Sequence, residues 1–201
     1  MIFGVWDPDQ CKAIVKVCKG NHLDTMGVRG RMDTLFPEEM LFLVEKSRMC
    51  LFLASSTSDN STSNEQPASI EECYALLLSS GVKLEEYLVY AHLKSLGNVL
   101  FRRGVIKHEW TCGGLQSIGD FRIWEGFEVW TPKEHFSRKS CPMPSFLLLI
   151  DTSRSCQREH VEFLKRSLEV AKAERTPVKL ACVVDGGVDF FNHSIATVAP
   201  M

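Results

Sequence analysis

The sequence has almost no excess of charge of either sign, and this absence excludes one class of protein at the outset. The 201 residues include 23 Lys and Arg against 25 Asp and Glu, a formal net charge of −2, with an isoelectric point of about 6.3. Proteins that bind nucleic acid mainly by electrostatic attraction carry a basic excess. Any contact with RNA is therefore expected to be local or to come through partner proteins.

The sequence also lacks the cysteine pairs that bind zinc or exchange disulfides. It has eight cysteines but no CxxC, the spacing typical of zinc and redox sites. A metal site could use only dispersed ligands such as His108, Cys112, His135 and Cys141, and buried free thiols are the commoner explanation of such cysteines. We therefore expect no metal, no cofactor and a reducing compartment.

Long apolar runs are missing as well. No stretch approaches the length of a membrane span, and residues 1–7 show neither the basic lead nor the apolar run of a signal peptide. Hydrophobic residues make up 45% and charged residues 24%, values that exclude a chain disordered throughout. We expect a protein of the cytosol or nucleus, and the function inferred below favours the nucleus.

The first half of the sequence predicts several helices followed by a short strand. Ser69 with Glu72 marks the start of one helix, because each side chain can bond a backbone N–H that the first turn leaves unpaired. The expected helices span residues 10–19, 37–46, 70–79 and 84–96, and the expected strands span residues 49–53 and 99–103. This order indicates a small winged-helix-like α/β domain over residues 1–104, with the polar stretch 54–68 as a mobile loop inside it.

The second half predicts a separate domain over residues 121–201, after a glycine-containing linker at residues 105–120. Asp185-Gly186-Gly187 predicts a hairpin turn, because these residues tolerate positive φ. The expected strands span residues 121–123, 127–129, 145–150, 178–184 and 188–191, and the expected helix spans residues 157–172. Strands and helices in this order make the predicted fold class α+β, with a compact second domain.

Several blocks of the sequence occur in an order and spacing that one known family shares. The blocks are TMGV at 25–28, LFPEEMLFLVE at 35–45, YAHLKSLG at 90–97, RRG at 102–104, FEVWTP at 127–132, PSFLLLI at 144–150 and LACVVDGGVDFF at 180–191. They resemble the tRNA-splicing endonuclease family, and specifically the larger non-catalytic subunit of the eukaryotic heterotetrameric enzyme. The resemblance covers nearly the whole chain, although that subunit often carries a large insert between its halves that is absent here.

The resemblance implies that catalytic subunits of the family cleave RNA without metal, using Tyr, His and Lys as general base, general acid and stabilising cation. In this sequence the Tyr position falls on Trp130, and the His position falls on Met143 or Pro144. The Lys position falls at residues 176–177, and Lys179 comes slightly too late. We therefore name no catalytic residue and predict an inactive subunit.

Other interpretations stay open from the residues alone. His135 and Lys133 could replace the missing groups, but a base would still be lacking, so a solvated pair is the better interpretation. Cys141 with His135 suggests a thiol nucleophile, yet no third group orients the two. A weakly active endoribonuclease with a rearranged site is one alternative, and a winged-helix DNA-binding or adaptor protein is another.

For assembly, the resemblance implies that the last strands of two subunits pair tail to tail and that an acidic turn docks in a basic groove of a third. The docking hairpin matches Asp185, Gly186, Gly187 and Asp189, and the tail-to-tail interface matches Val183, Val184, Phe190 and Phe191. Strand pairing would supply main-chain hydrogen bonds, and the phenylalanines would supply apolar anchors. An ordinary tight turn with solvated carboxylates is the alternative.

Basic residues expected near the domain junction are candidates for contact with RNA phosphates. They are Arg29, Arg31, Arg102, Arg103 and Lys107. Together these patterns predict a non-catalytic structural subunit of the tRNA-splicing endonuclease, without membrane contact. It would pair with the catalytic subunit that cleaves the 5′ splice site and would help to position intron-containing pre-tRNA.

Overall fold

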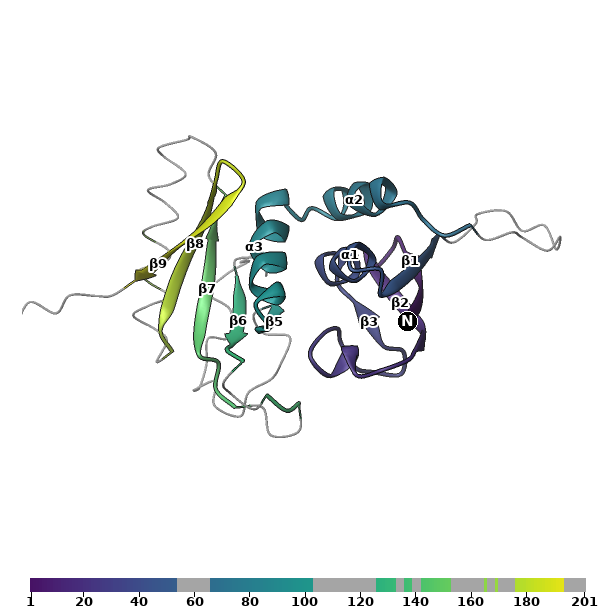
Figure 1. Ribbon diagram of the computed structural model, residues 1–201, viewed down its shortest axis with the longest axis horizontal. Helices are drawn as coiled ribbons and strands as arrows, with labels where there is room; N and C mark the ends of the chain where they lie inside the picture. Colours follow the sequence, from purple (N-terminus) through teal and green to yellow (C-terminus); the bar gives the residue numbers. More distant parts are fainter. Residues whose placement is uncertain are drawn as a thin grey trace, which may run out of the picture. The chain divides into compact units, whose positions relative to one another are not determined.

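The computed structural model describes residues 1–53, 66–102, 126–132, 136–138, 142–152, 165, 169 and 176–193. Its contacts divide the chain into two units, Met1–Tyr87 and Leu88–Met201. Each unit is built around its own β-sheet with helices beside it (Figure 1), so the predicted α+β class is confirmed. None of the helices in the described segments has both the length and the apolar character needed to cross a membrane.

A four-stranded sheet forms the first unit, in the order β3-β2-β1-β4. Its strands are β1 (Ile2–Asp7), β2 (Lys12–Cys18), β3 (Thr34–Leu35) and β4 (Met49–Leu53). A short 3-10 helix, η1 (His22–Asp24), follows β2. Strand β1 is antiparallel to β2 and parallel to β4. Ile2 and Trp6 are buried whereas Phe3 is exposed, so alternate side chains of β1 place the core on one face of the sheet.

The predicted helix over residues 10–19 is wrong, because most of this segment is strand β2. The Asp7 carboxylate accepts a hydrogen bond from the Asp9 N–H at 3.0 Å in a tight turn. Cys11 then takes a positive φ of 49°, which reverses the chain toward β1. The β-branched residues that follow suit a strand. The winged-helix-like description of the first domain is therefore not confirmed.

Three α-helices match the predicted helices closely. They are α1 (Pro37–Glu45), α2 (Ile70–Ser79) and α3 (Leu84–Ser95). Helix α1 packs on the sheet of the first unit (Figure 1). The predicted capping pair of α2 is present: the Ser69 N–H donates to Glu72 Oε2 at 2.7 Å, and the Glu72 N–H donates to Ser69 Oγ at 3.2 Å.

A five-stranded sheet forms the second unit, in the order β5-β6-β7-β8-β9. Its strands are β5 (Val99–Arg102), β6 (Phe127–Trp130), β7 (Phe146–Asp151), β8 (Val178–Val184) and β9 (Gly187–His193). Only β7 and β8 are parallel neighbours among these strands. Strand β5, which we expected to end the first domain, pairs with β6 in this sheet.

Several predicted segments lie outside the described residues. They are the linker 105–120, the strand 121–123, residues 54–65 of the expected loop and most of the helix 157–172. From that helix only Lys165 and Glu169 are described, and both are helical and exposed. At the last residue of the expected loop, the Ala68 N–H donates to the Leu51 carbonyl at 2.7 Å.

Both faces of the second sheet carry buried apolar side chains. Leu147, Leu149, Val178 and Leu180 form a buried cluster on one face. On the other face, helix α3 contacts the sheet through Tyr90, whose ring centroid lies 5.6 Å from that of Phe127 in β6 (Figure 1). Among the described residues, β9 pairs with β8 alone, so it is the outer strand at one edge of the sheet.

Candidate functional site at the edge of the second sheet

The hairpin between β8 and β9 turns on two residues with positive φ. Asp185 has a φ of 49° and Gly186 a φ of 79°, and Val184 pairs with Gly187 across the turn. Two successive residues of this kind suit a type I′ turn, whose twist matches that of the flanking strands. The predicted hairpin is therefore present.

The hairpin presents two acidic side chains to solvent, Asp185 at the tip and Asp189 on β9. Asp189 lies opposite Cys182, and Cys182 lies beside Asp151 in the neighbouring strand. Burial, followed by the charges of Asp189 and Asp151, raises the pKa of the Cys182 thiol. The thiol is thus held in its unreactive protonated form, and the chemistry that this hairpin offers is that of exposed carboxylates.

Two of the four residues predicted for tail-to-tail pairing, Phe190 and Phe191, lie on β9. The outer side of β9, which has no partner strand among the described residues, is the free edge of the sheet. Phe190 lies opposite Ala181 and Phe191 opposite Leu180, so the two phenylalanines occupy opposite faces of the sheet. Phe190 is 37% exposed and Phe191 is 55% exposed. An outer strand with exposed aromatic side chains is a template for pairing with another chain.

The other two residues predicted for this interface lie on β8. Val183 is half-buried, and Val184 is exposed beside the turn. Sequence reasoning missed a further neighbour of the edge, His92 in α3. Its ring centroid lies 5.8 Å from that of Phe190. The signal was its place in the YAHLKSLG block, but only the fold brings that block to β9.

The residue at the expected Tyr position, Trp130, is a packed core residue. Its side chain is fully buried, and its Nε1–H donates to the Pro142 carbonyl at 2.7 Å. The rings of Phe101 and Phe136 contact the indole, with centroids at 6.0 and 5.0 Å, and the Arg138 guanidinium lies 4.7 Å over Phe101. An indole has no proton that titrates in the physiological range, so this position cannot supply a general base.

The residues at or near the expected Lys and His positions are Lys179 and Met143. The Lys179 ammonium lies 4.3 Å from the centroid of the Phe146 ring, a cation–π contact. Met143, at the expected His position, is exposed and has no acid–base function. His135, Lys133 and Cys141, the alternatives considered from the sequence, lie outside the described residues.

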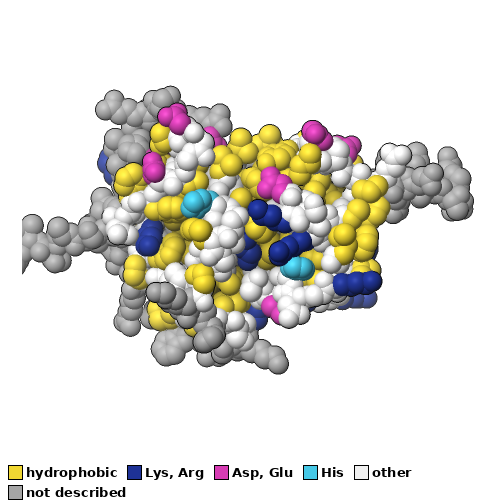
Figure 2. Space-filling model, in the orientation of Figure 1, with side chains coloured by type: hydrophobic (Ala, Val, Ile, Leu, Met, Phe, Trp, Pro, Cys, Tyr) yellow, Lys and Arg dark blue, Asp and Glu magenta, His cyan; other side chains and the backbone are white. Residues whose placement is uncertain are grey.

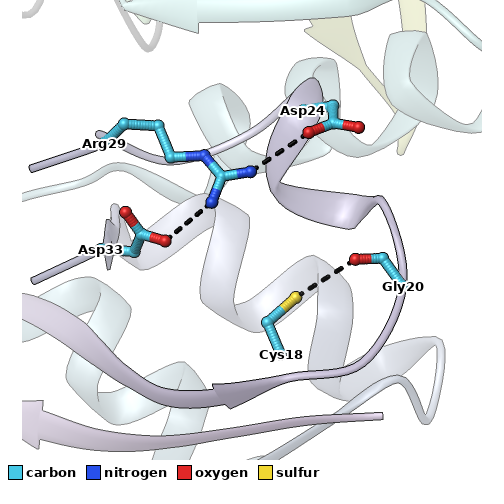
Figure 3. A network of polar contacts seen from close by, with 5 residues as sticks. All are labelled: Cys18, Gly20, Asp24, Arg29 and Asp33. Atoms are coloured by element: carbon cyan, nitrogen blue, oxygen red, sulfur yellow. Dashed lines mark hydrogen bonds and ion pairs between the residues drawn. The ribbon is translucent and has the colours of Figure 1, made fainter.

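The structure describes three of the five candidate RNA-contacting cations, Arg29, Arg31 and Arg102. The Arg29 guanidinium lies between two carboxylates (Figure 3). Its Nη2 is 3.1 Å from Asp24 Oδ1, and its Nη1 is 2.8 Å from Asp33 Oδ2. Arg31 is exposed. Arg102 is only 7% exposed at the end of β5, whereas Arg103 and Lys107 lie outside the described residues. Of the described cations in this group, Arg31 is therefore the one best placed to meet a phosphate.

Figure 2 shows one face of the molecule, on which charges of both signs occur. On the face drawn in Figure 2, Lys and Arg side chains form small separate groups among hydrophobic and neutral ones. This pattern agrees with the net charge of −2. Across the described segments, no group of three or more His, Cys, Asp or Glu side chains is arranged to hold a metal ion. The dispersed ligand set that includes His108 and Cys112 lies outside those segments.

Two of the sequence blocks that carry the family resemblance are joined by one buried side chain, Glu39. Its Oε1 accepts a hydrogen bond from the Gly27 N–H at 2.7 Å, and its Oε2 accepts one from the Phe36 N–H at 2.9 Å. Gly27 has a φ of +72°. A Cβ at this position would lie 2.5 Å from the Thr34 carbonyl oxygen. The TMGV block thus meets the LFPEE block through a contact that requires Gly at 27 and a carboxylate at 39.

Glu45, the last residue of α1, is hydrogen-bonded to tyrosines on α2 and α3. The Tyr74 hydroxyl donates to Glu45 Oε1 at 2.5 Å, and the Tyr87 hydroxyl donates to Oε2. Burial and the hydrogen bond to Glu45 raise the pKa of Tyr74 to about 12, and the same causes raise the pKa of Tyr87. This contact is structural, because both phenols are held in their neutral form.

Comparison with known proteins shows which proteins this chain is similar to. Residues 1–53 match the family model described as the tRNA-splicing endonuclease subunit sen54 N-term. The tRNA-splicing endonuclease subunit SEN54 of Eremothecium gossypii is 32% identical over 103 residues, 50% of this chain and 22% of that protein. The subunit of the same name from Saccharomyces cerevisiae is 28% identical over 102 residues, 48% of this chain and 22% of that protein. About half of this chain is therefore similar to proteins named tRNA-splicing endonuclease subunit SEN54.

The family resemblance predicted from the sequence blocks is therefore confirmed. The contact between Gly27 and Glu39 lies inside the 53 residues that match the family model, so it accounts in physical terms for two blocks of the family pattern. The chain spans about a fifth of the length of the SEN54 relatives.

Proposed function

We propose that this chain is a non-catalytic structural subunit of the tRNA-splicing endonuclease and acts in the nucleus. It pairs with the catalytic subunit that cleaves the 5′ splice site and helps to position intron-containing pre-tRNA. The observation that carries the proposal is the similarity of half of the chain to proteins named tRNA-splicing endonuclease subunit SEN54.

The non-catalytic role is supported by the surroundings of Trp130. A residue that removes a proton from RNA must be accessible to the RNA and must be able to accept a proton. Trp130 meets neither requirement. Its side chain is fully buried, and its single side-chain donor, Nε1–H, is hydrogen-bonded to the Pro142 carbonyl. The Lys179 ammonium, the cation nearest to the expected catalytic position, faces the ring of Phe146.

The assembly role is supported by the β8–β9 hairpin. Its outer strand offers a free main-chain edge with Phe190 and Phe191 exposed on opposite faces, and its tip carries Asp185. A strand from the catalytic subunit would satisfy the edge, and a basic groove on a third subunit would suit the acidic tip. Contact with pre-tRNA on this chain is then local, through exposed cations such as Arg31.

The experiment that tests the proposal is affinity purification of the tagged full chain from nuclear extract at moderate salt, followed by mass spectrometry. We expect the two catalytic subunits and the small structural subunit of the endonuclease in comparable amounts. Their absence would contradict the proposal. Retention of duplex DNA with a steep salt dependence, in place of these subunits, would favour the adaptor alternative.

A further inference from the structure

The free edge of the second sheet is flanked by helix α3. The planes of the His92 and Phe190 rings are inclined by 38°, with their centroids 5.8 Å apart. Two residues earlier, Tyr90 contacts Phe127 in β6. Helix α3 therefore contacts the same face of the sheet both at β6 and at the outer strand β9.

An exposed side chain extends this contact along the helix. Leu96 follows His92 by four residues, and its N–H donates to the His92 carbonyl at 3.2 Å, so the two lie one helical turn apart on the same side. Leu96 is 60% exposed, and His92 is also exposed. Single exposed leucines are common. This one lies one turn from a ring that already contacts the exposed Phe190.

The backbone at this edge specifies the kind of partner that fits. Strand β9 has seven residues, Gly187–His193, and it pairs with β8 on one side only among the described residues. The unpaired N–H and C=O groups of an outer strand are best satisfied by another strand. Successive side chains of an added strand alternate between the faces of the sheet. One set would therefore meet Phe190, and the other would meet Phe191.

We propose that His92 and Leu96 form the helical half of the subunit interface. The occupant is an outer strand of the catalytic subunit, which adds to β9 and places an apolar side chain against Phe190, His92 and Leu96. This inference rests on the proposed function and adds a second element to its interface, since His92 on α3 and Leu96 directly after it now contribute beside residues on β8 and β9. His92 acts as a positioning residue for Phe190, and Leu96 provides apolar contact area.

The test measures the dissociation constant between the purified full chain and the purified catalytic subunit. Leu96→Asp places a charge in the interface and should weaken binding by about tenfold or more. His92→Ala removes a ring contact and should weaken binding by about threefold to tenfold. Leu78→Asp is the matched control, because Leu78 is a comparably exposed helical leucine, 54% exposed on α2 of the first unit. We expect its binding to equal that of the wild type.

A second variant separates positioning from general destabilisation. His92→Phe keeps a ring against Phe190 and should restore binding to within about twofold of the wild type. Equal weakening by His92→Phe and His92→Ala would overturn the role of His92. Wild-type affinity in both Leu96→Asp and His92→Ala would overturn the inference while leaving the proposed function intact. Failure of the wild-type chain to bind the catalytic subunit would remove both.

Discussion

Glu39 shows how a single buried carboxylate can organise a fold at the residue scale. A buried charge is costly unless hydrogen bonds compensate for its lost hydration. Both oxygens of Glu39 accept backbone N–H groups, one from Gly27 and one from Phe36 at the start of α1. The donors lie on either side of β3, so this side chain fixes the loop before the strand against the helix after it.

The close approach at Gly27 leads to a stability prediction with a matched control. Gly27→Ala should lower the free energy of unfolding by about 2–4 kcal/mol, because the positive φ and the contact with the Thr34 carbonyl are both unfavourable. Gly81→Ala has a similar φ of +81° but meets no atom within 4 Å, so we expect a loss of only about 1 kcal/mol. Urea unfolding measures both. An equal loss of unfolding free energy in the two variants would mean that the loop around residue 27 shifts to make room for the added methyl group.

At the element scale, Glu45 connects α1 to α2 and α3 through two tyrosine hydroxyls. The contact forms only while the phenols are protonated, because each hydroxyl donates to the carboxylate. The folded-state pKa of Tyr74 is about 12, against an ordinary value of 10. A pKa raised in the folded state means that the stabilisation is present below the unfolded pKa and is lost as the pH rises through the folded pKa.

The Tyr74 contact therefore predicts a loss of stability between about pH 10 and about pH 12. Tyr74→Phe removes the hydroxyl, so its free energy of unfolding should fall less over this range than that of the wild type. Urea unfolding at both ends of the range gives the comparison. Parallel curves for the two proteins would show that the Tyr74 hydroxyl makes no net contribution.

The β8–β9 hairpin predicts a separation of docking from stability at the same scale. Asp185 and Asp189 are exposed, so the double substitution Asp185→Asn with Asp189→Asn should leave the melting temperature within about 2 °C of the wild type. Retention of a subunit that presents a basic groove should fall by about tenfold or more, because complementary charge is lost. Co-purification at two salt concentrations checks this. Unchanged retention would mean that the turn is only a tight connection.

At the scale of the whole molecule, this chain combines a first unit that contains the family match at residues 1–53 with a second unit that carries the free sheet edge. The first unit carries the match to the sen54 N-terminal family model, and the second has an outer strand that we propose as a surface for assembly. Neither offers a Tyr, His and Lys arrangement among its described residues at the positions that the family pattern predicts.

The purified full chain is therefore expected not to cleave intron-containing pre-tRNA above the rate in buffer. The physical reason is that Trp130 has no titratable proton and is sealed in an aromatic cluster. Incubation with labelled pre-tRNA at several protein concentrations measures this. Cleavage that is lost in the His135→Ala variant would establish the rearranged endoribonuclease that we considered from the sequence.

Local chemistry explains which parts of the fold were predictable. The capping pair Ser69 and Glu72, the Asp185-Gly186 turn and the apolar run of β7 depend on neighbours within a few residues, and all three are present as expected. The sequence predicts a helix at strand β2 because the apolar residues of this segment fit both the spacing of a helix face and the alternation of a strand. The segment forms a strand because β1 and β3 pair with it on either side.

The sequence by itself determined the resemblance to the tRNA-splicing endonuclease family, through several short blocks of residues. It also determined the helices α1, α2 and α3 and the hairpin, because their signals lie within a few neighbouring residues. The tertiary structure alone decided that Arg29 pairs with two carboxylates, that Arg102 is buried, that Glu39 reaches Gly27 and that His92 meets Phe190. Each of these facts joins residues from different elements or depends on how elements pack. Burial and pairing of this kind arise only when the whole unit folds, and no local pattern of residue types encodes them.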